Sequence, residues 1–162
     1  MKKKNKAILT LISGIFIGAV IGGVIALTKR REKENRWKQM SNKHLNLMLL
    51  FNRWLHLKQQ NKSIVEYLHD EGIETVAIYG MSYLGQRLYD ELKNTDIDVC
   101  YAIDNNSGAV YTEIDIYSPK DQLKKVDAVI VTAVTFFDEI KDNLSNKIDA
   151  KILSLEDILD VL

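Results

Sequence analysis

The chain has 162 residues, 46% of them hydrophobic, and is formally neutral, with 22 Lys and Arg against 22 Asp and Glu. Residues 1–62 carry 14 Lys and Arg and two Glu, whereas residues 63–162 carry 8 Lys and Arg and 20 Asp and Glu. A basic segment with its own partner therefore precedes a separate acidic domain. This globular part has about 100 residues, enough for one hydrophobic core but not for a second domain. The single cysteine, Cys100, excludes an intrachain disulfide.

The N-terminal part predicts a membrane anchor. A basic tail, residues 1–6, precedes 22 residues without a charge, which begin at Ala7 and end at Thr28. As a helix they extend about 33 Å, enough for a hydrocarbon core of about 30 Å. The stretch is longer than the apolar part of a typical signal peptide. Its end, directly before Lys29, also lacks a convincing small-residue cleavage site. We therefore expect an uncleaved, single-pass transmembrane helix in the cell membrane over residues 7–28.

The distribution of Lys and Arg around this span indicates its orientation. Four lysines precede it, and seven Lys and Arg lie within about 15 residues after it. The excess favours a cytoplasmic location for the globular domain, where free nucleotides are also found. The margin is small, so the opposite topology stays open.

Three glycines, Gly14, Gly18 and Gly22, recur at every fourth residue of the predicted span. On a helix this spacing lines one face with no side chains, so that a second helix can approach closely. Helix pairing in the membrane is one interpretation. The other is that an isolated anchor merely tolerates these glycines.

A long basic helix is predicted to follow the anchor, over residues 29–62. Its apolar residues recur at three- or four-residue spacings and form one stripe, which consists of Trp37, Met40, His44, Leu47, Phe51 and Trp54. The stripe can lie against anionic lipid, pack on the globular domain, or pair with a helix of a partner protein. His44 and His56 have no Cys, Asp or Glu at ligand spacing, so we expect no metal site.

The globular domain, residues 63–162, begins with a capped short helix after Ser63, which ends at Gly72. A strand over residues 75–79 then ends at Gly80, a helix runs from Ser82 or Tyr83 to Lys93, and a strand over 98–103 ends at Asp104. This strand, turn, helix and strand are typical of the nucleotide-binding half of a Rossmann fold.

The turn after the first strand is the predicted binding site. Gly80 suits a tight turn, and Gly85 allows the helix and the strand to approach closely. The start of the helix favours a diphosphate, and Asp104 lies at the distance in sequence that suits a ribose diol. Ser82 occupies the position of the middle glycine in the G-x-G-x-x-G pattern, where its Cβ restricts the approach of a pyrophosphate. In the alternative interpretation, both glycines serve the turn alone.

Strands and helices alternate through the rest of the domain. We expect a third strand over residues 114–117, a helix that begins at Pro119, a strand over 127–132, a helix over 134–143, a strand over 151–154 and a final helix capped by Ser154. The alternation predicts an α/β fold of three layers, α/β/α, with a five-stranded parallel sheet in the order 3-2-1-4-5. The candidate cofactor-binding residues are Gly80, Met81, Ser82, Tyr83, Leu84, Gly85, Asp104, Asn105, Thr132, Ala133 and Val134.

Residues 73–106 resemble the small Rossmann-type NAD(P)- or nucleotide-binding domains of bacterial proteins that make surface polysaccharides, capsular or secreted. Such domains include the N-terminal domains of sugar O-acyltransferases and of membrane-bound nucleotide-sugar dehydratases. The run from Ile116 to Ala133 is similar to the next part of the same pattern. The resemblance implies a membrane-anchored module that binds NAD or a nucleotide sugar and assists polysaccharide biosynthesis.

The sequence contains no evident catalytic constellation. No histidine lies between Gly72 and Leu162, and the acid pairs Asp90-Glu91 and Asp138-Glu139 are interpreted as solvated helix surface. We therefore expect a binding module rather than an enzyme, with no metal and no nucleic-acid partner. Two alternatives remain: an interaction protein without a ligand, and an oxidoreductase or sugar-modifying subunit that needs a partner chain.

Overall fold

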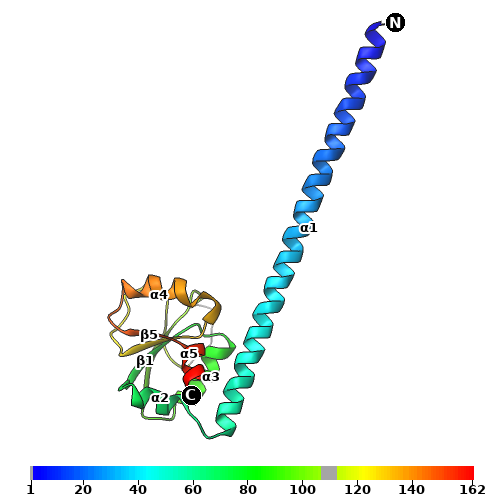
Figure 1. Cartoon of the computed structure of the whole chain (residues 1–162). Helices are drawn as coiled ribbons and strands as arrows, with labels where there is room; N and C mark the ends of the chain where they lie inside the picture. Colours follow the sequence, from blue (N-terminus) through cyan, green and yellow to red (C-terminus); the bar gives the residue numbers. More distant parts are fainter. Residues whose placement is uncertain (1, 107–112) are drawn as a thin grey trace. The chain divides into compact units, whose positions relative to one another are not determined.

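The computed structural model describes the backbone of residues 2–106 and 113–162 and the side chains of residues 28–106 and 113–162. Contacts between residues divide the chain into two units, Met1–Asn46 and Leu47–Leu162. Helix α1 (Lys2–Gln59) forms the first unit and continues into the second, which holds all the described strands (Figure 1).

The predicted transmembrane segment lies within the helical backbone of α1. Apart from Thr28, its residues have side chains outside the described part of the structure, and this applies to Gly14, Gly18 and Gly22 as well. Within the part that is described, no helix is both long and apolar enough to cross a membrane.

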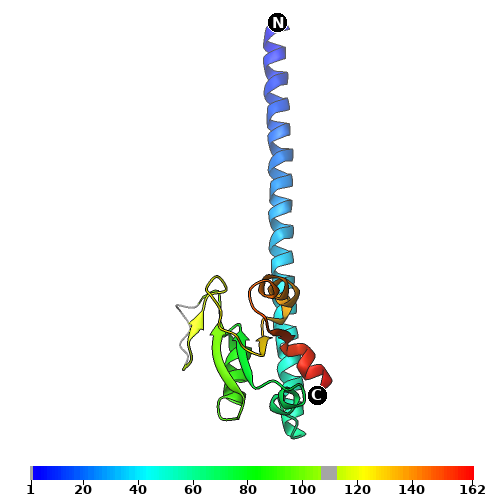
Figure 2. The same cartoon turned by 90° about the vertical axis from the view of Figure 1, so that its left-hand side faces the viewer.

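A five-stranded parallel sheet forms the centre of the second unit. Its strands are β1 (Thr75–Tyr79), β2 (Asp98–Ile103), β3 (Ile116–Tyr117), β4 (Ala128–Val131) and β5 (Lys151–Ser154). All neighbouring strands pair in parallel, in the order β3-β2-β1-β4-β5. Figure 2 shows the short yellow β3 at one edge of the sheet, beside the green β2. The predicted α/β class, the five parallel strands and their order are confirmed.

Helices cover both faces of this sheet (Figure 1). They are α2 (Ile64–Asp70), α3 (Tyr83–Leu92), the 3-10 helix η1 (Val134–Phe136), α4 (Phe137–Ser145) and α5 (Leu155–Val161). Side chains of β1 alternate between the faces, because Val76 and Ile78 pack with α3 and α5, whereas Ala77 and Tyr79 pack with α4. Two hydrophobic cores result, one on each face of the sheet.

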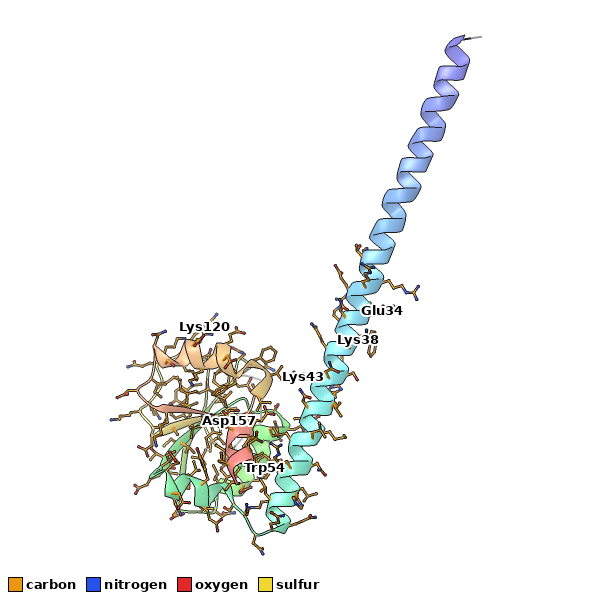
Figure 3. All side chains as sticks on the ribbon, in the orientation of Figure 1. Glu34, Lys38, Lys43, Trp54, Lys120 and Asp157 are labelled. Atoms are coloured by element: carbon orange, nitrogen blue, oxygen red, sulfur yellow. The ribbon has the colours of Figure 1, made fainter. Side chains whose placement is uncertain are left out.

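The end of α1 packs on the same core as α3 and α5. Leu50, Trp54 and Leu57 are buried there, and the Trp54 indole N–H donates to Glu91 Oε2 at 2.8 Å (Figure 3). Of the predicted apolar stripe, Leu47, Phe51 and Trp54 pack on this core, whereas Trp37, Met40 and His44 are exposed. The second unit thus includes the last turns of α1, which the sequence assigned to a separate helical segment.

The carboxylate of Glu91 joins three helices. Its Oε1 accepts from the Ile64 backbone N–H at 3.2 Å and lies 3.0 Å from Lys58 Nζ, while Oε2 accepts from Trp54. The Glu91 side chain is only 9% exposed. Its interpretation as a solvated helix residue was wrong, because its position on α3 faces α1 and the start of α2.

The helix predicted to begin at Pro119 does not form. Ser118 N–H donates to Asp121 Oδ2 at 2.7 Å, and Asp121 N–H donates to the Ser118 carbonyl at 2.9 Å. The hydrogen bonds expected at the start of a helix are thus formed within one isolated turn. The Pro119 carbonyl accepts from Lys147 Nζ at 2.7 Å. Residues 122–126 then run without regular structure into β4, with Val126 buried.

Other boundaries differ by small amounts. The predicted limits of β1, β2 and β5 are confirmed to the residue. The third strand is shorter than predicted, since only Ile116 and Tyr117 pair with β2. The predicted helix after β4 forms in two parts, first η1 and then α4.

Candidate functional site

The turn between β1 and α3 depends on two glycines. Gly80 has φ +95, and its N–H donates to the Ile103 carbonyl at 2.8 Å. A Cβ built on Gly80 would lie 3.0 Å from Thr132 Oγ1, and a Cβ on Gly85 would lie 2.0 Å from the Gly80 carbonyl oxygen. Gly85 therefore allows the first turn of α3 to approach the end of β1, as the sequence predicted.

Asp104, the predicted ribose ligand, lies directly beside this turn. Its Oδ2 accepts from the Met81 N–H at 2.8 Å, and its Oδ1 accepts from the Asn106 N–H at 2.8 Å. The carboxylate thus ties the end of β2 to the turn after β1. Each oxygen of an ionised carboxylate has a further lone pair, so the ribose contact stays a prediction beside this structural role.

The remaining residues of the turn divide between the core and the surface. Met81 and Leu84 are 1% and 2% exposed and belong to the core beneath α3. Ser82 is the N-cap of α3, with an extended backbone and no hydrogen bond from its side chain to the cap. Tyr83 is 75% exposed. Of these four side chains, only Ser82 and Tyr83 are therefore open to a ligand.

The end of β4 is fastened to the same turn. Thr132 is buried, its hydroxyl donates to the Gly80 carbonyl at 2.6 Å, and its N–H donates to the Tyr79 carbonyl at 2.9 Å. A Cβ built on Gly80 would lie 3.6 Å from Ala133, and Val134 begins η1 and packs against the core beneath α3. The structure thus brings Thr132 and Ala133, two of the predicted cofactor-binding residues, close to Gly80.

A cavity of about 470 Å³ lies on the α4 side of this edge of the sheet. It is lined by Tyr79, Asn105, Pro119, Lys120, Ala133, Phe136, Glu139, Ile140, Asn143, Leu144 and Lys147. Asn105 and Ala133 are the two predicted site residues among them, whereas the residues from Gly80 to Gly85 and Asp104 are not part of the lining. The labelled Lys120 lies at the surface beside α4 (Figure 3).

The absence of a helix over residues 118–126 accounts for this cavity. Right-handed crossovers place this connection on the same face of the sheet as α4, and the described turn there leaves space between Pro119 and α4. The sequence did not predict that Lys120, Phe136 and Glu139 belong to a site. It placed Lys120 in a helix that begins at Pro119, and it placed Phe136 and Glu139 in the helix after β4 with no cavity beside them. No motif in the sequence marks these residues.

The lining combines an aromatic ring with groups that form hydrogen bonds. Phe136 is 51% exposed, and Glu139, Asn143 and Lys120 supply a carboxylate, an amide and an ammonium group. Burial, and then the negative charges of Asp104 and Glu139, raise the pKa of the Tyr79 hydroxyl, which therefore stays protonated at neutral pH and can donate. Such a set can stack on a planar or sugar ring and bind its hydroxyl groups.

Metal coordination has no support among the residues that the structure describes. No group of three or more His, Cys, Asp or Glu side chains there could hold a metal ion. The cavity lining contains one carboxylate and no histidine or cysteine.

These features define an α/β domain with a doubly wound parallel sheet, a glycine turn after its first strand and a cavity at the carboxyl edge. The chain belongs to the family described as C2185-like, N-terminal, whose model matches residues 72–153. The matched part includes the whole cavity lining and all of the sheet except Ser154. Neither the curated proteins nor the solved structures contain a significant match to the chain.

Proposed function

We propose that the second unit is a binding module for a nucleotide or nucleotide sugar. The observation that carries this proposal is the cavity of about 470 Å³ at the carboxyl edge of the parallel sheet. Open α/β sheets bind ligands at this edge, beside the point where the strand order reverses, and ligand sites typically have volumes of about 300–1,000 Å³. β1 and β4 meet at that point, and Tyr79 and Ala133 at their ends line the cavity.

The chemistry of the lining favours a sugar over an apolar ligand. Phe136 offers an exposed ring for stacking, and Glu139 and Asn143 offer acceptors and donors to hydroxyl groups. Lys120 offers a positive charge to a phosphate. The predicted phosphate contact at Ser82 and the ribose contact at Asp104 are part of this proposal. NAD is the alternative ligand.

The setting of this module is also a proposal. The uncharged span that begins at Ala7 anchors the chain in the cell membrane, and the excess of Lys and Arg after Thr28 keeps the domain in the cytoplasm. The resemblance to domains of polysaccharide biosynthesis proteins favours an accessory role in making surface polysaccharide.

Ligand-induced stabilisation of the full chain in mild detergent tests the binding function. The panel consists of NAD, NADP, UDP-sugars, CoA and free nucleotides, and thermal unfolding is followed by tryptophan fluorescence. A ligand at about 100 times its dissociation constant, bound only to the folded state, adds about 2.7 kcal/mol to the free energy of unfolding. We expect a shift with UDP-sugars, and no shift with any compound would contradict the proposal.

Paired variants locate the site of any ligand that responds. Glu139→Gln removes a charged acceptor, so affinity falls about tenfold, whereas Asp138→Asn, on the next residue of α4 and outside the lining, leaves it unchanged. Asp104→Ala distinguishes the turn after β1 from the cavity beside α4. If Asp104→Ala weakens binding and Glu139→Gln does not, the ligand lies at the turn and not in the cavity.

A second candidate function has one observation in its favour. Asp104, Gly80 and Thr132 all form contacts within the fold, which is the arrangement expected of a turn that serves the fold alone. In that case the chain is an interaction protein and its domain binds no nucleotide. An enzymatic subunit completed by a partner chain has no comparable observation.

A further inference from the structure

Helix α1 has two apolar sides within the second unit. One side carries Leu50, Trp54 and Leu57, which are 5–7% exposed and pack on the domain. The other side, here called the outer face, consists of Met48, Leu49, Asn52 and Leu55. Met48, Leu49 and Leu55 are 60%, 53% and 59% exposed, and Asn52 is also exposed. At about 100° per residue, the outer face points away from the packed side.

Two basic residues beside the outer face are paired with the domain, and a third, His56, shares a hydrogen bond with Gln60 at 2.9 Å. Arg53 forms an ion pair with Asp160, and Lys58 forms one with Glu91 at 3.0 Å. The outer face itself carries no charged residue. Since α1 has no acidic residue after Glu34, its uncharged side is the one that a second copy of this helix can contact without like-charge repulsion.

The spacing on the outer face fits a partner helix. Leu45, Met48, Asn52 and Leu55 follow one another by three, four and three residues, which is the a-d-a-d pattern of a heptad repeat. Asn52 then occupies an a position. A buried amide needs a hydrogen-bond partner, and two parallel helices in register place Asn52 opposite Asn52, a pairing that is known to fix register and favour dimers.

We propose that two copies of this chain associate in parallel through the outer face of α1, with Asn52 of one copy beside Asn52 of the other. A lipid surface covers the three apolar side chains but leaves the Asn52 amide without a specific partner. In an antiparallel pair, Asn52 faces the apolar d positions. The second copy, in parallel, is the occupant that satisfies every residue of the face.

The outer face is short compared with the roughly 800 Å² that each partner contributes to a standard interface. We therefore expect weak pairing, which a covalent bond can trap. In a Cys100→Ala background, Asn52→Cys is compared with Asn46→Cys in the full chain in its own cell membranes under mild oxidation. Asn46 is exposed on α1 and lies outside the heptad seam. Disulfide-linked dimer should form at least fivefold faster from Asn52→Cys.

A charge on the outer face tests whether that face holds the pair. Leu55→Lys, combined with Asn52→Cys, should reduce the dimer to the level of Asn46→Cys, whereas Asn46→Lys should leave it unchanged. Because Leu55 is 59% exposed, thermal unfolding should not distinguish the two lysine variants. Equal crosslinking from positions 46 and 52, or dimer that persists in Leu55→Lys, would overturn the proposal. So would preferential crosslinking between Leu45→Cys and Leu55→Cys, an a and a d position that lie opposite each other only in an antiparallel pair.

Discussion

At the scale of single residues, the contacts of Gly85 explain why a glycine occurs at this position in the motif. The carbonyl oxygen of Gly80 lies 2.0 Å from the place of a Cβ on Gly85. Because that oxygen belongs to the backbone of the turn, no side-chain rotation can relieve the clash. The glycine is required by the fold, whether or not a phosphate binds.

Gly85→Ala should therefore lower the free energy of unfolding by about 3 kcal/mol, the upper part of the range for overpacking. Gly72→Ala is the matched control, because Gly72 has φ +66 and no atom within 4 Å of an added Cβ. The control should lose only about 1 kcal/mol from left-handed backbone strain. Urea unfolding in mild detergent measures both, and equal losses would mean that the clash relaxes.

Asp127 connects the starts of two central strands. Its Oδ2 accepts from the Thr75 hydroxyl at 2.7 Å, the Thr75 N–H at 2.8 Å and the Glu74 N–H at 3.2 Å. These hydrogen bonds, with the Thr75 hydroxyl first, hold the pKa of the Asp127 carboxyl below its ordinary value. The charged form is therefore favoured in the folded state.

Stability from Asp127 should depend on pH. An unfolded Asp has a pKa of about 3.9, so the contribution is complete above that pH and disappears as the pH falls through the lower folded value. Urea midpoints of the native chain and of Asp127→Asn should differ most between about pH 6 and pH 7 and converge below about pH 4. A difference that stays constant over this range would contradict the assigned cause.

At the scale of elements, the end of α1 is part of the domain core. Trp54 and Leu57 cover the same core as α3 and α5, and Glu91 accepts hydrogen bonds from α1 and from the start of α2. A domain cut at Ser63 loses these groups, so the core under α1 becomes exposed and Glu91 loses Trp54 and Lys58 as partners. A fragment that contains this domain is therefore expected to need residues from Leu47 onward for full stability.

Glu91→Ala should lower the free energy of unfolding by about 3 kcal/mol, because it leaves the Trp54 indole N–H and the Ile64 N–H without an acceptor. The neighbouring Asp90 is the control. It pairs with Arg87 at 2.7 Å and Lys93 at 3.0 Å at the surface, so Asp90→Ala should cost at most about 1 kcal/mol. Urea unfolding distinguishes the two, and a small loss in Glu91→Ala would show that α1 packs through its apolar contacts alone.

At the scale of the whole molecule, the charge division of the sequence separates a basic first part from an acidic domain. The proposed anchor accounts for the uncharged stretch that ends at Thr28, and the Lys and Arg after it can contact anionic headgroups. Hydrophobic and electrostatic attachment respond differently to salt and alkali, so they can be separated by extraction.

The full chain should stay with the membrane after washes with high salt and with alkaline carbonate. A chain that begins at Lys29 keeps the basic helix without the span, and high salt should release it. A cytoplasmic reporter fused after Leu162 should be active if the Lys and Arg excess sets the topology. Release of the full chain by carbonate would contradict the proposed transmembrane anchor. Activity of a periplasmic or external reporter would contradict the proposed cytoplasmic location of the domain.

Local patterns in the sequence determined much of the fold. The apolar runs and turn glycines predicted β1, β2 and β5 to the residue, and alternation of strands with helices, together with right-handed crossovers, predicted the order β3-β2-β1-β4-β5. These features depend on neighbouring residues and on general rules of connection. The close approach at Gly85 was predictable for the same reason, since the motif spacing encodes it.

Contacts between distant parts of the chain decided the rest. Nothing within the sequence around Glu91 distinguishes it from Asp90, and only the packing of α1 and α2 against α3 buries it. The turn at Pro119 is held by Lys147, 28 residues away, and it opens the cavity that Phe136 and Glu139 line. Burial and cavities arise from tertiary packing, so the sequence indicated which edge of the sheet could bind a ligand, and the fold determined which side chains are there.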